Sequence, residues 1–501
     1  MTESAASYRR ILTSSSIIGG ASVISILIGL ARTKALAMLL GPAGVGLVGL
    51  YSALMTTAVT VASVGVGSAG ARQIAEAIGK EDTHALAVAR RAMFWGTILL
   101  ASAGAIVVWS LRDVLAVHVL GGQEHAGVVG WLAVGVALSV AGASQGALIQ
   151  GMRRIGDMAR LSVYSAVLST VFGIGLLLQW GNAALWAYIL VIPVVNFVLG
   201  GVYVARLPKT HYDNIILQEI GTQWKTLARF GIAVMGAHLV SSVIYLWIRV
   251  SVSDGLGLEA VGYSQAATSI SAQYIGFVLS AMAADYYPRL TSVIGDKAAA
   301  IRLVNQQTEI ALLLSAPILL AMIGLAPWVI HLLYSDAFTP AVDVLRWQVL
   351  GDVLKLASWP LGLIILASGD GKGYFWSDSA ACLLMGGLTA WLLPHFGLQS
   401  VGIAYFLMYL FYLPLALWMA RKRIGFAWPS TITKLLITVF GLCVANAIIG
   451  RYSPWGTPLS LLLPVGFCFY TFTRLAKSAG TPAILKGIVK ATRAITVARK
   501  K

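Results

Sequence analysis

Several charged side chains lie inside long apolar stretches of the sequence, where a charge is costly. Arg32 and Lys34 lie in the first of these stretches, and Arg249 lies in a later one. A charge at the centre of a bilayer costs about 2.5–3.5 kcal/mol, so such a residue is expected to face a water-filled cavity or a partner. Because a guanidinium group stays charged and binds phosphate through paired hydrogen bonds, these cations predict a binding site for a diphosphate. The alternative is that they pair within the structure or extend to the membrane interface, and this applies most to Lys34.

A second group of charges occupies the apolar stretch 342–367. Arg346 lies near its start, and Asp352 and Lys355 follow, three residues apart and therefore on one face of a helix. An internal salt bridge that holds this helix is the simpler interpretation. A role in gating or proton coupling is the alternative.

Two further carboxylates, Asp378 and Asp285, are candidates for proton coupling. Asp285 has Arg289 four residues later as a local partner. Asp378 lies near the start of its predicted helix, where an anion stabilises the helix dipole.

Three glutamines are candidates for contacts with sugar hydroxyl groups: Gln145, Gln265 and Gln273. Each lies on a helix that we expect to line a central cavity. Hydrogen bonding between neighbouring helices is the other common use of glutamine in membranes.

Nothing in the sequence indicates catalysis, so we predict no catalytic residues, no cofactor and no metal site. The three cysteines, Cys382, Cys443 and Cys468, all lie in apolar stretches, where thiols are usually inert. The longest predicted external loop, residues 111–125, contains no arrangement of nucleophile, base and acid. The chain also lacks the phosphate-binding loop motif that would indicate direct use of ATP.

Composition places these residues in an all-α polytopic membrane protein. Of the 501 residues, 58% are hydrophobic and 11% are charged, against about 25% charged in soluble proteins. The apolar residues form stretches of about 20, the length that crosses a bilayer. We predict about fourteen transmembrane helices, at residues 14–40, 45–69, 92–110, 126–150, 160–179, 183–205, 228–252, 260–284, 310–333, 342–367, 374–393, 398–420, 432–450 and 457–474.

The distribution of basic residues predicts the orientation of these helices. With the N-terminus in the cytoplasm, 29 of the 36 Lys and Arg residues fall on the cytoplasmic side, and only Arg112 and Arg451 fall on the other. Cytoplasmic loops of membrane proteins carry such an excess. We therefore expect both termini in the cytoplasm, and we do not expect nucleic acid to be a partner, because the charge of +17 forms no exposed basic stripe.

The chain contains an internal repeat with an offset of 216 residues. Leu40-Gly41 and Val45-Gly46 match Leu256-Gly257 and Val261-Gly262, and with a slip of one residue Arg32 matches Arg249. Because each copy contains six helices, an even number, the copies are parallel and are related by a pseudo-two-fold axis along the membrane normal. The predicted domains are an N-lobe of helices 1–6 at residues 1–206, a C-lobe of helices 7–12 at residues 224–423, and helices 13–14 with a basic tail at residues 424–501.

Two segments resemble a known family. Residues 40–46 (LGPAGVG) and residues 347–355 (WQVLGDVLK) are similar to segments of the O-antigen flippases of the Wzx type, most of all to those for the enterobacterial common antigen lipid intermediate. This family belongs to the multidrug/oligosaccharidyl-lipid/polysaccharide exporter (MOP) superfamily. The resemblance implies alternating access that carries an undecaprenyl-diphosphate-linked oligosaccharide, such as an O-antigen repeat unit, from the cytoplasmic to the periplasmic leaflet of the bacterial inner membrane. It also implies a polysaccharide polymerase and a chain-length regulator as partners, besides membrane lipids.

The resemblance also bears on the cation site. Ala31-Arg32 resembles the segment in the first helix of the lipid II flippase, whose arginine lines a cationic cavity, but residues 45–69 contain no charge and so supply no second-helix arginine. The alternatives are a lipid II flippase and a drug or cation exporter of the same superfamily. An exporter normally has a carboxylate-lined cavity, whereas the charges within the predicted spans are mostly cationic here.

Overall fold

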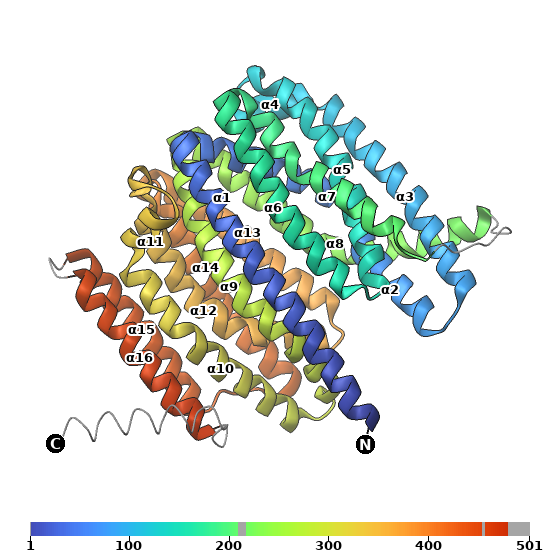
Figure 1. The fold of residues 1–501 in the computed structure, drawn as a ribbon. Coiled ribbons are helices and arrows are strands. Elements are labelled where there is room, and N and C mark those ends of the chain that lie inside the picture. Colours follow the sequence, from blue (N-terminus) through green and yellow to red (C-terminus); the bar gives the residue numbers. More distant parts are fainter. Residues whose placement is uncertain (1, 209–216, 453–455, 479–501) are drawn as a thin grey trace, which may run out of the picture. The chain divides into compact units, whose positions relative to one another are not determined.

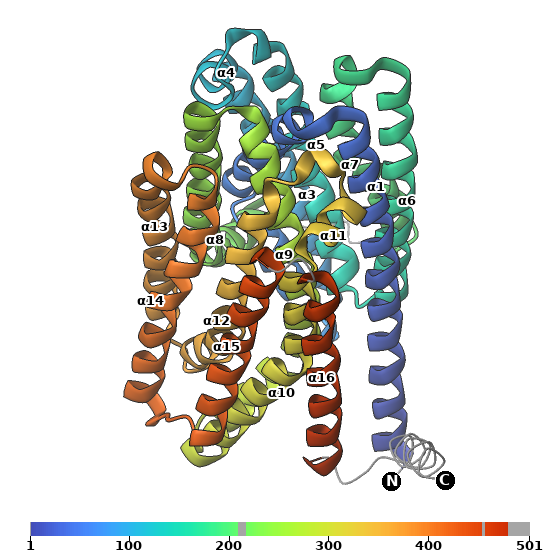
Figure 2. The same cartoon turned by 90° about the vertical axis from the view of Figure 1, so that its left-hand side faces the viewer.

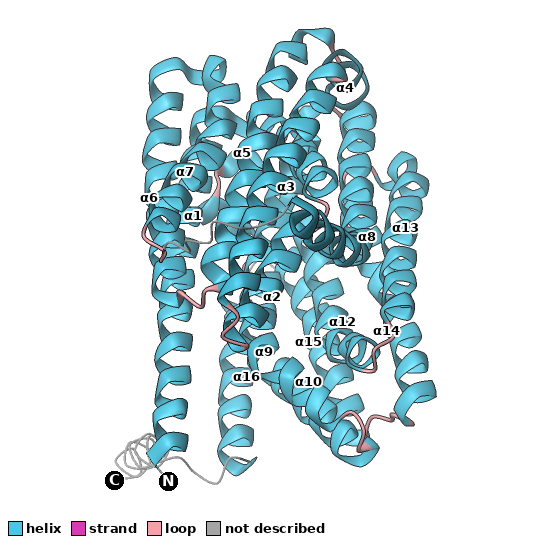
Figure 3. Ribbon diagram, turned by 90° about the vertical axis from the view of Figure 1, so that its right-hand side faces the viewer, coloured by secondary structure: helices cyan, strands magenta, loops and turns pink. Residues whose placement is uncertain are grey.

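The computed structural model describes residues 2–208, 217–452 and 456–478, which form helices joined by short loops. No strand occurs in these ranges (Figure 3). The first helices are α1 (Thr2–Ser63), α2 (Val66–Gly79), α3 (Thr83–Ser110), α4 (Arg112–Leu120), α5 (Ala126–Gly151), α6 (Ile155–Trp180), α7 (Leu185–Ala205) and α8 (Leu217–Leu256). The others are α9 (Leu258–Val293), α10 (Lys297–Gly324), α11 (Ala326–Leu333), α12 (Ala341–Ala367), α13 (Gly371–Phe396), α14 (Gln399–Ile424), α15 (Ser430–Tyr452) and α16 (Gly456–Ser478).

Helix α1 contains two of the predicted spans as two arms (Figure 1). They meet at Gly41, whose φ of 64° and ψ of −173° are not helical, and Pro42 follows. Glycine adopts a positive φ without the steric cost that a side chain adds, and proline starts a helix readily because its missing N–H would have no partner there. The Gly41-Pro42 pair therefore reverses the chain between two spans without a separate loop.

Ten helical segments among the described residues are long and apolar enough to cross a membrane. Two of them, Gly19–Ser63 and Ile155–Ala205, each cover all or most of two predicted spans. Helices α9 and α16, which cover the predicted spans 260–284 and 457–474, are not among the ten. The all-helical multi-pass membrane fold is confirmed, and the number fourteen stays a prediction.

Three short helices fall where the sequence predicted other structure. The second span ends at Ser63 rather than residue 69, and α2 then begins at Val66 after a turn at Val64 and Gly65, both with positive φ. Helix α4 occupies the predicted loop 111–125, and α11 begins after α10 has ended at Gly324, inside the predicted span 310–333. Each is too short to give the long apolar signal on which the predicted spans rest.

Packing divides the chain into two compact units. The first contains Met1–Gln273, Ile330–Val344 and Gly371–Met408, and the second contains Tyr274–Val329, Leu345–Asp370 and Tyr409–Lys501. This division does not follow the repeat, so the three predicted domains stay a prediction.

In the first unit, corresponding helices of the two repeats pack in the same way. Helix α1 packs along α6, and α8 packs along α13, as the first and fifth spans of each repeat. Helix α5 packs between α3 and α7 (Figure 1), and α8 also contacts α1, α2 and α3. In the second unit, α15 and α16 pack against each other and against α10 (Figure 2).

Candidate functional site

The candidate site is organised around a close contact between α1 and α9 in the first unit. A Cβ on Gly46 would lie 2.1 Å from the carbonyl oxygen of Leu258, and a Cβ on Gly262 would lie 2.0 Å from that of Pro42. Gly46 and Gly262 are 216 residues apart, and so are Pro42 and Leu258. The contact is thus reciprocal between equivalent positions of the repeat, which places the pseudo-two-fold axis between the two glycines. Only glycine lets the backbones approach this closely.

Arg249 reaches this contact from α8. Its guanidinium Nη1 donates a hydrogen bond of 2.6 Å to the carbonyl oxygen of Gly49, one turn after Gly46 in the second arm of α1. Gln265 of α9 lies beside the same residue, because a Cβ on Gly49 would be 3.4 Å from its side chain. Arg249 and Gln265 are both half-buried, so the structure brings a predicted cation and a predicted sugar-binding amide together around Gly49.

Arg32 lies on the first arm of α1. Its side chain is half-buried and interacts electrostatically with Tyr188 of α7. Gln273 of α9 lies beside Gly29, which precedes Arg32 by about one turn of α1. A Cβ on Gly29 would be 3.8 Å from Gln273 Nε2. Helix α9 thus presents one glutamine to each arm of α1. Gln273 lies within about a turn of Arg32 on the first arm, and Gln265 lies beside the residue of the second arm to which Arg249 is bonded.

Lys34, the third predicted phosphate-binding cation, makes a structural contact with α11. Its Nζ donates a hydrogen bond of 2.7 Å to the carbonyl oxygen of His331 in α11. The ring of His331 in turn contacts Asp336 through Nδ1, at 2.5 Å. An ammonium group has three protons, so this bond ties α1 to α11 and leaves Lys34 able to donate further bonds.

Gln145 lies apart from this group. It belongs to α5 and packs against α7, where a Cβ on Gly200 would lie 2.3 Å from Gln145 Oε1. The structure therefore places Gln145 in a contact between two neighbouring helices.

The predicted charges of α12 lie in the second unit, where they bond to helices of that unit. Asp352 is fully buried and its Oδ2 accepts a hydrogen bond of 2.5 Å from the Tyr274 hydroxyl of α9. Arg346 Nη2 donates a 3.0 Å hydrogen bond to the Gly450 carbonyl oxygen of α15. Lys355 Nζ lies 5.8 Å from the ring centre of Tyr409. These contacts connect α12 with α9, α14 and α15.

Asp378 lies in a different polar group, between α8 and α13 of the first unit. Ser241 Oγ lies 3.5 Å from Asp378 Oδ2, at the limit of a hydrogen bond, and 3.2 Å from the Cys382 thiol. His238 interacts with the same carboxylate electrostatically. The side chain of Asp285, the other predicted coupling residue, lies outside the described part of the chain.

Two polar partners were missed by sequence reasoning, namely Tyr274 and Ser241. Each is separated from its carboxylate by a long stretch of chain, 78 residues for Tyr274 and 137 for Ser241. Uncharged hydroxyl groups are common in membrane helices, so only their position in the fold identifies them.

Comparison with solved structures shows the fold that this chain shares with other proteins. The structure superposes on the lipid II flippase MurJ in an inward closed conformation with a TM-score of 0.70 at 14% identity, covering 92% of this chain and 98% of that one. It also matches an inward-facing multidrug resistance MATE family transporter of the MOP superfamily, with a TM-score of 0.65 at 17% identity, over 84% of this chain and 99% of that one. The fold is therefore that of the MOP superfamily.

The family follows from the sequence. The profile of the polysaccharide biosynthesis protein family matches residues 35–343, which is more than half of the chain, and the chain belongs to this family. The lipid III flippase of Escherichia coli (strain K12) is 24% identical over 412 residues, which cover 79% of this chain and 94% of the relative, and that of Shigella flexneri matches equally. These findings confirm the resemblance to the Wzx-type flippases, and the named relatives are flippases and transporters rather than enzymes.

Proposed function

We propose that the chain is a flippase that translocates an undecaprenyl-diphosphate-linked oligosaccharide by alternating access. The observation that carries the proposal is the pair of half-buried arginines, Arg32 and Arg249. Both lie in helical segments long and apolar enough to span a membrane, and they match in the repeat with a slip of one residue. The membership in a polysaccharide biosynthesis family and the similarity to lipid III flippases support it.

In this proposal the diphosphate binds the arginines. The bond from Arg249 to the Gly49 carbonyl uses one of the five N–H groups of the guanidinium. The guanidinium can therefore keep this bond and still bind a phosphate. Gln265 and Gln273 bind hydroxyl groups of the sugar next to the diphosphate. The prenyl tail stays in the lipid, because burying it in a polar cavity would forfeit its hydrophobic stabilisation.

The orientation completes the proposal. The chain spans the bacterial inner membrane with both termini on the cytoplasmic side, as the excess of basic residues on that side predicts. The substrate is loaded from the cytoplasmic leaflet and released on the periplasmic side. A polysaccharide polymerase and a chain-length regulator then receive the product there.

The test compares flipping rates in proteoliposomes that contain a labelled undecaprenyl-diphosphate-linked oligosaccharide. Arg32→Ala and Arg249→Ala should each lower the rate about tenfold to a hundredfold, since a hydrogen bond to a charged group contributes about 1.5–3 kcal/mol. Arg160→Ala is the matched control, because this exposed residue makes only a surface pair with Asp157.

A second variant separates binding from folding. Arg249→Lys keeps a charge that can donate to the Gly49 carbonyl but loses the paired geometry for phosphate, and should therefore retain stability and lose flipping. Wild-type rates in folded Arg32→Ala and Arg249→Ala protein would contradict the proposed site.

A further inference from the structure

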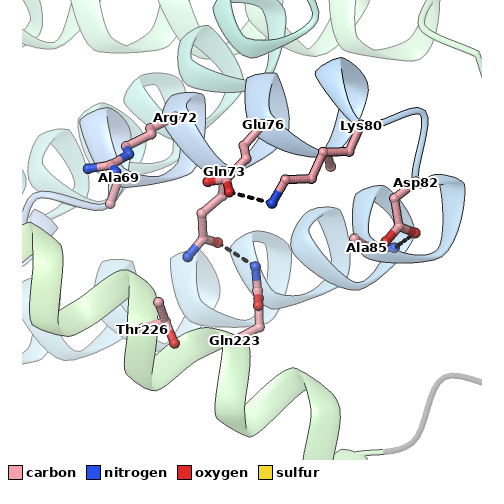
Figure 4. A pocket seen from close by; sticks show the side chains of 10 residues that line it. Ala69, Arg72, Gln73, Glu76, Lys80, Asp82, Ala85, Gln223 and Thr226 are labelled. Carbon is pink, nitrogen blue, oxygen red and sulfur yellow. Dashed lines mark hydrogen bonds and ion pairs between the residues drawn. The ribbon is translucent and has the colours of Figure 1, made fainter.

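A pocket with several polar and charged side chains in its lining lies between α2, the start of α3 and α8 of the first unit (Figure 4). Its volume is about 390 Å³, within the range of about 300–1,000 Å³ typical of small-molecule sites. It is lined by Ala69, Arg72, Gln73, Glu76, Ala77, Lys80, Asp82, Ala85, Gln223 and Thr226. None of these residues belongs to the candidate site around Arg32 and Arg249.

The walls of this pocket are fixed by packing. Beneath it, Ile74, Met93 and Leu227 belong to one buried apolar cluster that joins α2, α3 and α8. Gln223 Nε2 donates a 2.8 Å hydrogen bond to Gln73 Oε1 across the pocket, so α8 is bonded to α2 (Figure 4). Trp224, the next residue of α8, packs onto Gly96 of α3, where a Cβ would lie 2.4 Å from its ring. The pocket is therefore preformed.

The ionised groups in the lining are set by their local contacts. Lys80 Nζ and Glu76 Oε1 form an ion pair of 2.8 Å. This bond lowers the pKa of Glu76 and raises that of Lys80, so both are charged at neutral pH. Asp82 accepts a 2.8 Å hydrogen bond from the Ala85 N–H through Oδ1, as the cap of α3. Each carboxylate has a second oxygen with further acceptor capacity.

Donors and acceptors are balanced across the pocket. Glu76, Asp82 and Gln223 offer acceptor oxygens, and Gln73 Nε2 and Lys80 offer N–H groups. An anion would meet two carboxylates, and a cation would meet Lys80 and Arg72. A hydroxyl group both donates and accepts, so a ligand with several hydroxyl groups fits this lining best.

We propose that this pocket binds a sugar residue of the lipid-linked oligosaccharide on the cytoplasmic side, before translocation. The inference rests on the proposed function and its predicted orientation, which place α2 and the start of α8 in the cytoplasm, where the glycan is loaded. The pocket is a glycan-recognition site separate from the diphosphate site at the arginines. It makes the flippase select lipids that carry a sugar over the bare carrier lipid.

The test measures binding of two lipid probes to the full chain in nanodiscs by native mass spectrometry. One probe is bare undecaprenyl diphosphate, and the other is the pool of undecaprenyl-diphosphate-linked saccharides extracted from the cells that produce the chain. Wild type should bind the glycosylated lipid about tenfold more tightly than the bare lipid. One or two net hydrogen bonds to the sugar account for an affinity ratio of this size.

Two variants assign this preference to the pocket. Glu76→Ala removes an acceptor, and Ala85→Phe fills the pocket with a side chain, so each should abolish the tenfold preference while binding of the bare lipid is unchanged. Lys225→Ala, on the exposed side of α8 outside the lining, should keep it.

The outcomes separate this inference from the proposed function. Equal binding of the two lipids by wild type, or an unchanged preference in both pocket variants, would overturn the glycan site and leave the flippase proposal standing. Failure of wild type to bind either lipid would overturn both.

Discussion

At the scale of single residues, the two buried carboxylates of the predicted coupling group have different surroundings. Asp352 is fully buried and bonded to the Tyr274 hydroxyl. Asp378 is half-buried and lies near Ser241, Cys382 and His238. A proton carrier must exchange protons during transport, so we propose Asp378 as the coupling residue and a structural role for Asp352.

This assignment predicts different effects of two matched variants. In this proposal an imposed proton gradient changes the flipping rate of the wild type, and Asp378→Asn should remove that response, because the amide cannot carry a proton. Asp352→Asn should keep the response and instead lower the unfolding temperature, because the asparagine NH2 group adds donors that need partners in a fully buried site. The readouts are flipping rates with and without the gradient, and thermal unfolding. A gradient response that survives in Asp378→Asn would refute the assignment.

At the scale of elements, the contact of α1 with α9 depends on two glycines. A methyl group at Gly46 or Gly262 would collide with backbone carbonyl groups, which cannot move aside as a flexible side chain can. Overpacking of this kind typically costs about 1–3 kcal/mol.

We therefore expect Gly46→Ala and Gly262→Ala to lower the unfolding temperature of the purified protein. Gly146→Ala in α5 is the control, since a Cβ there meets nothing within 4 Å and alanine favours a helix by about 0.5–1 kcal/mol over glycine. If Gly46→Ala unfolded at the temperature of the wild type, the close contact of α1 with α9 would be excluded.

The sequence carries much of this element-level information, but not all of it. Runs of apolar residues predicted the long helices because burial in lipid demands about 20 such residues. The repeat predicted that Gly46 and Gly262 are equivalent, but not that they touch, because equivalence under a symmetry operation does not place a residue on its axis. Likewise, Arg249 was predicted as a cavity cation, while its bond to the Gly49 carbonyl, 200 residues away in sequence, depends on the packing of α8 against α1.

At the scale of the whole molecule, two groups of residues are proposed to recognise the substrate. We propose that the arginines of α1 and α8 bind the diphosphate and that the pocket at α2 and α8 binds a sugar of the same lipid. In this proposal the arginines determine the class of substrate, and the pocket discriminates within that class.

The central claim is that the chain moves a lipid-linked oligosaccharide rather than a cationic drug. The most direct measurement reconstitutes the wild-type chain in liposomes with a fluorescent undecaprenyl-diphosphate-linked oligosaccharide and follows the access of an impermeant quencher to the glycan. Parallel liposomes contain a cationic dye such as ethidium. We expect the glycan to cross between leaflets and the dye not to be transported. Export of the dye with an immobile glycolipid would contradict the proposed flippase function and identify a drug exporter.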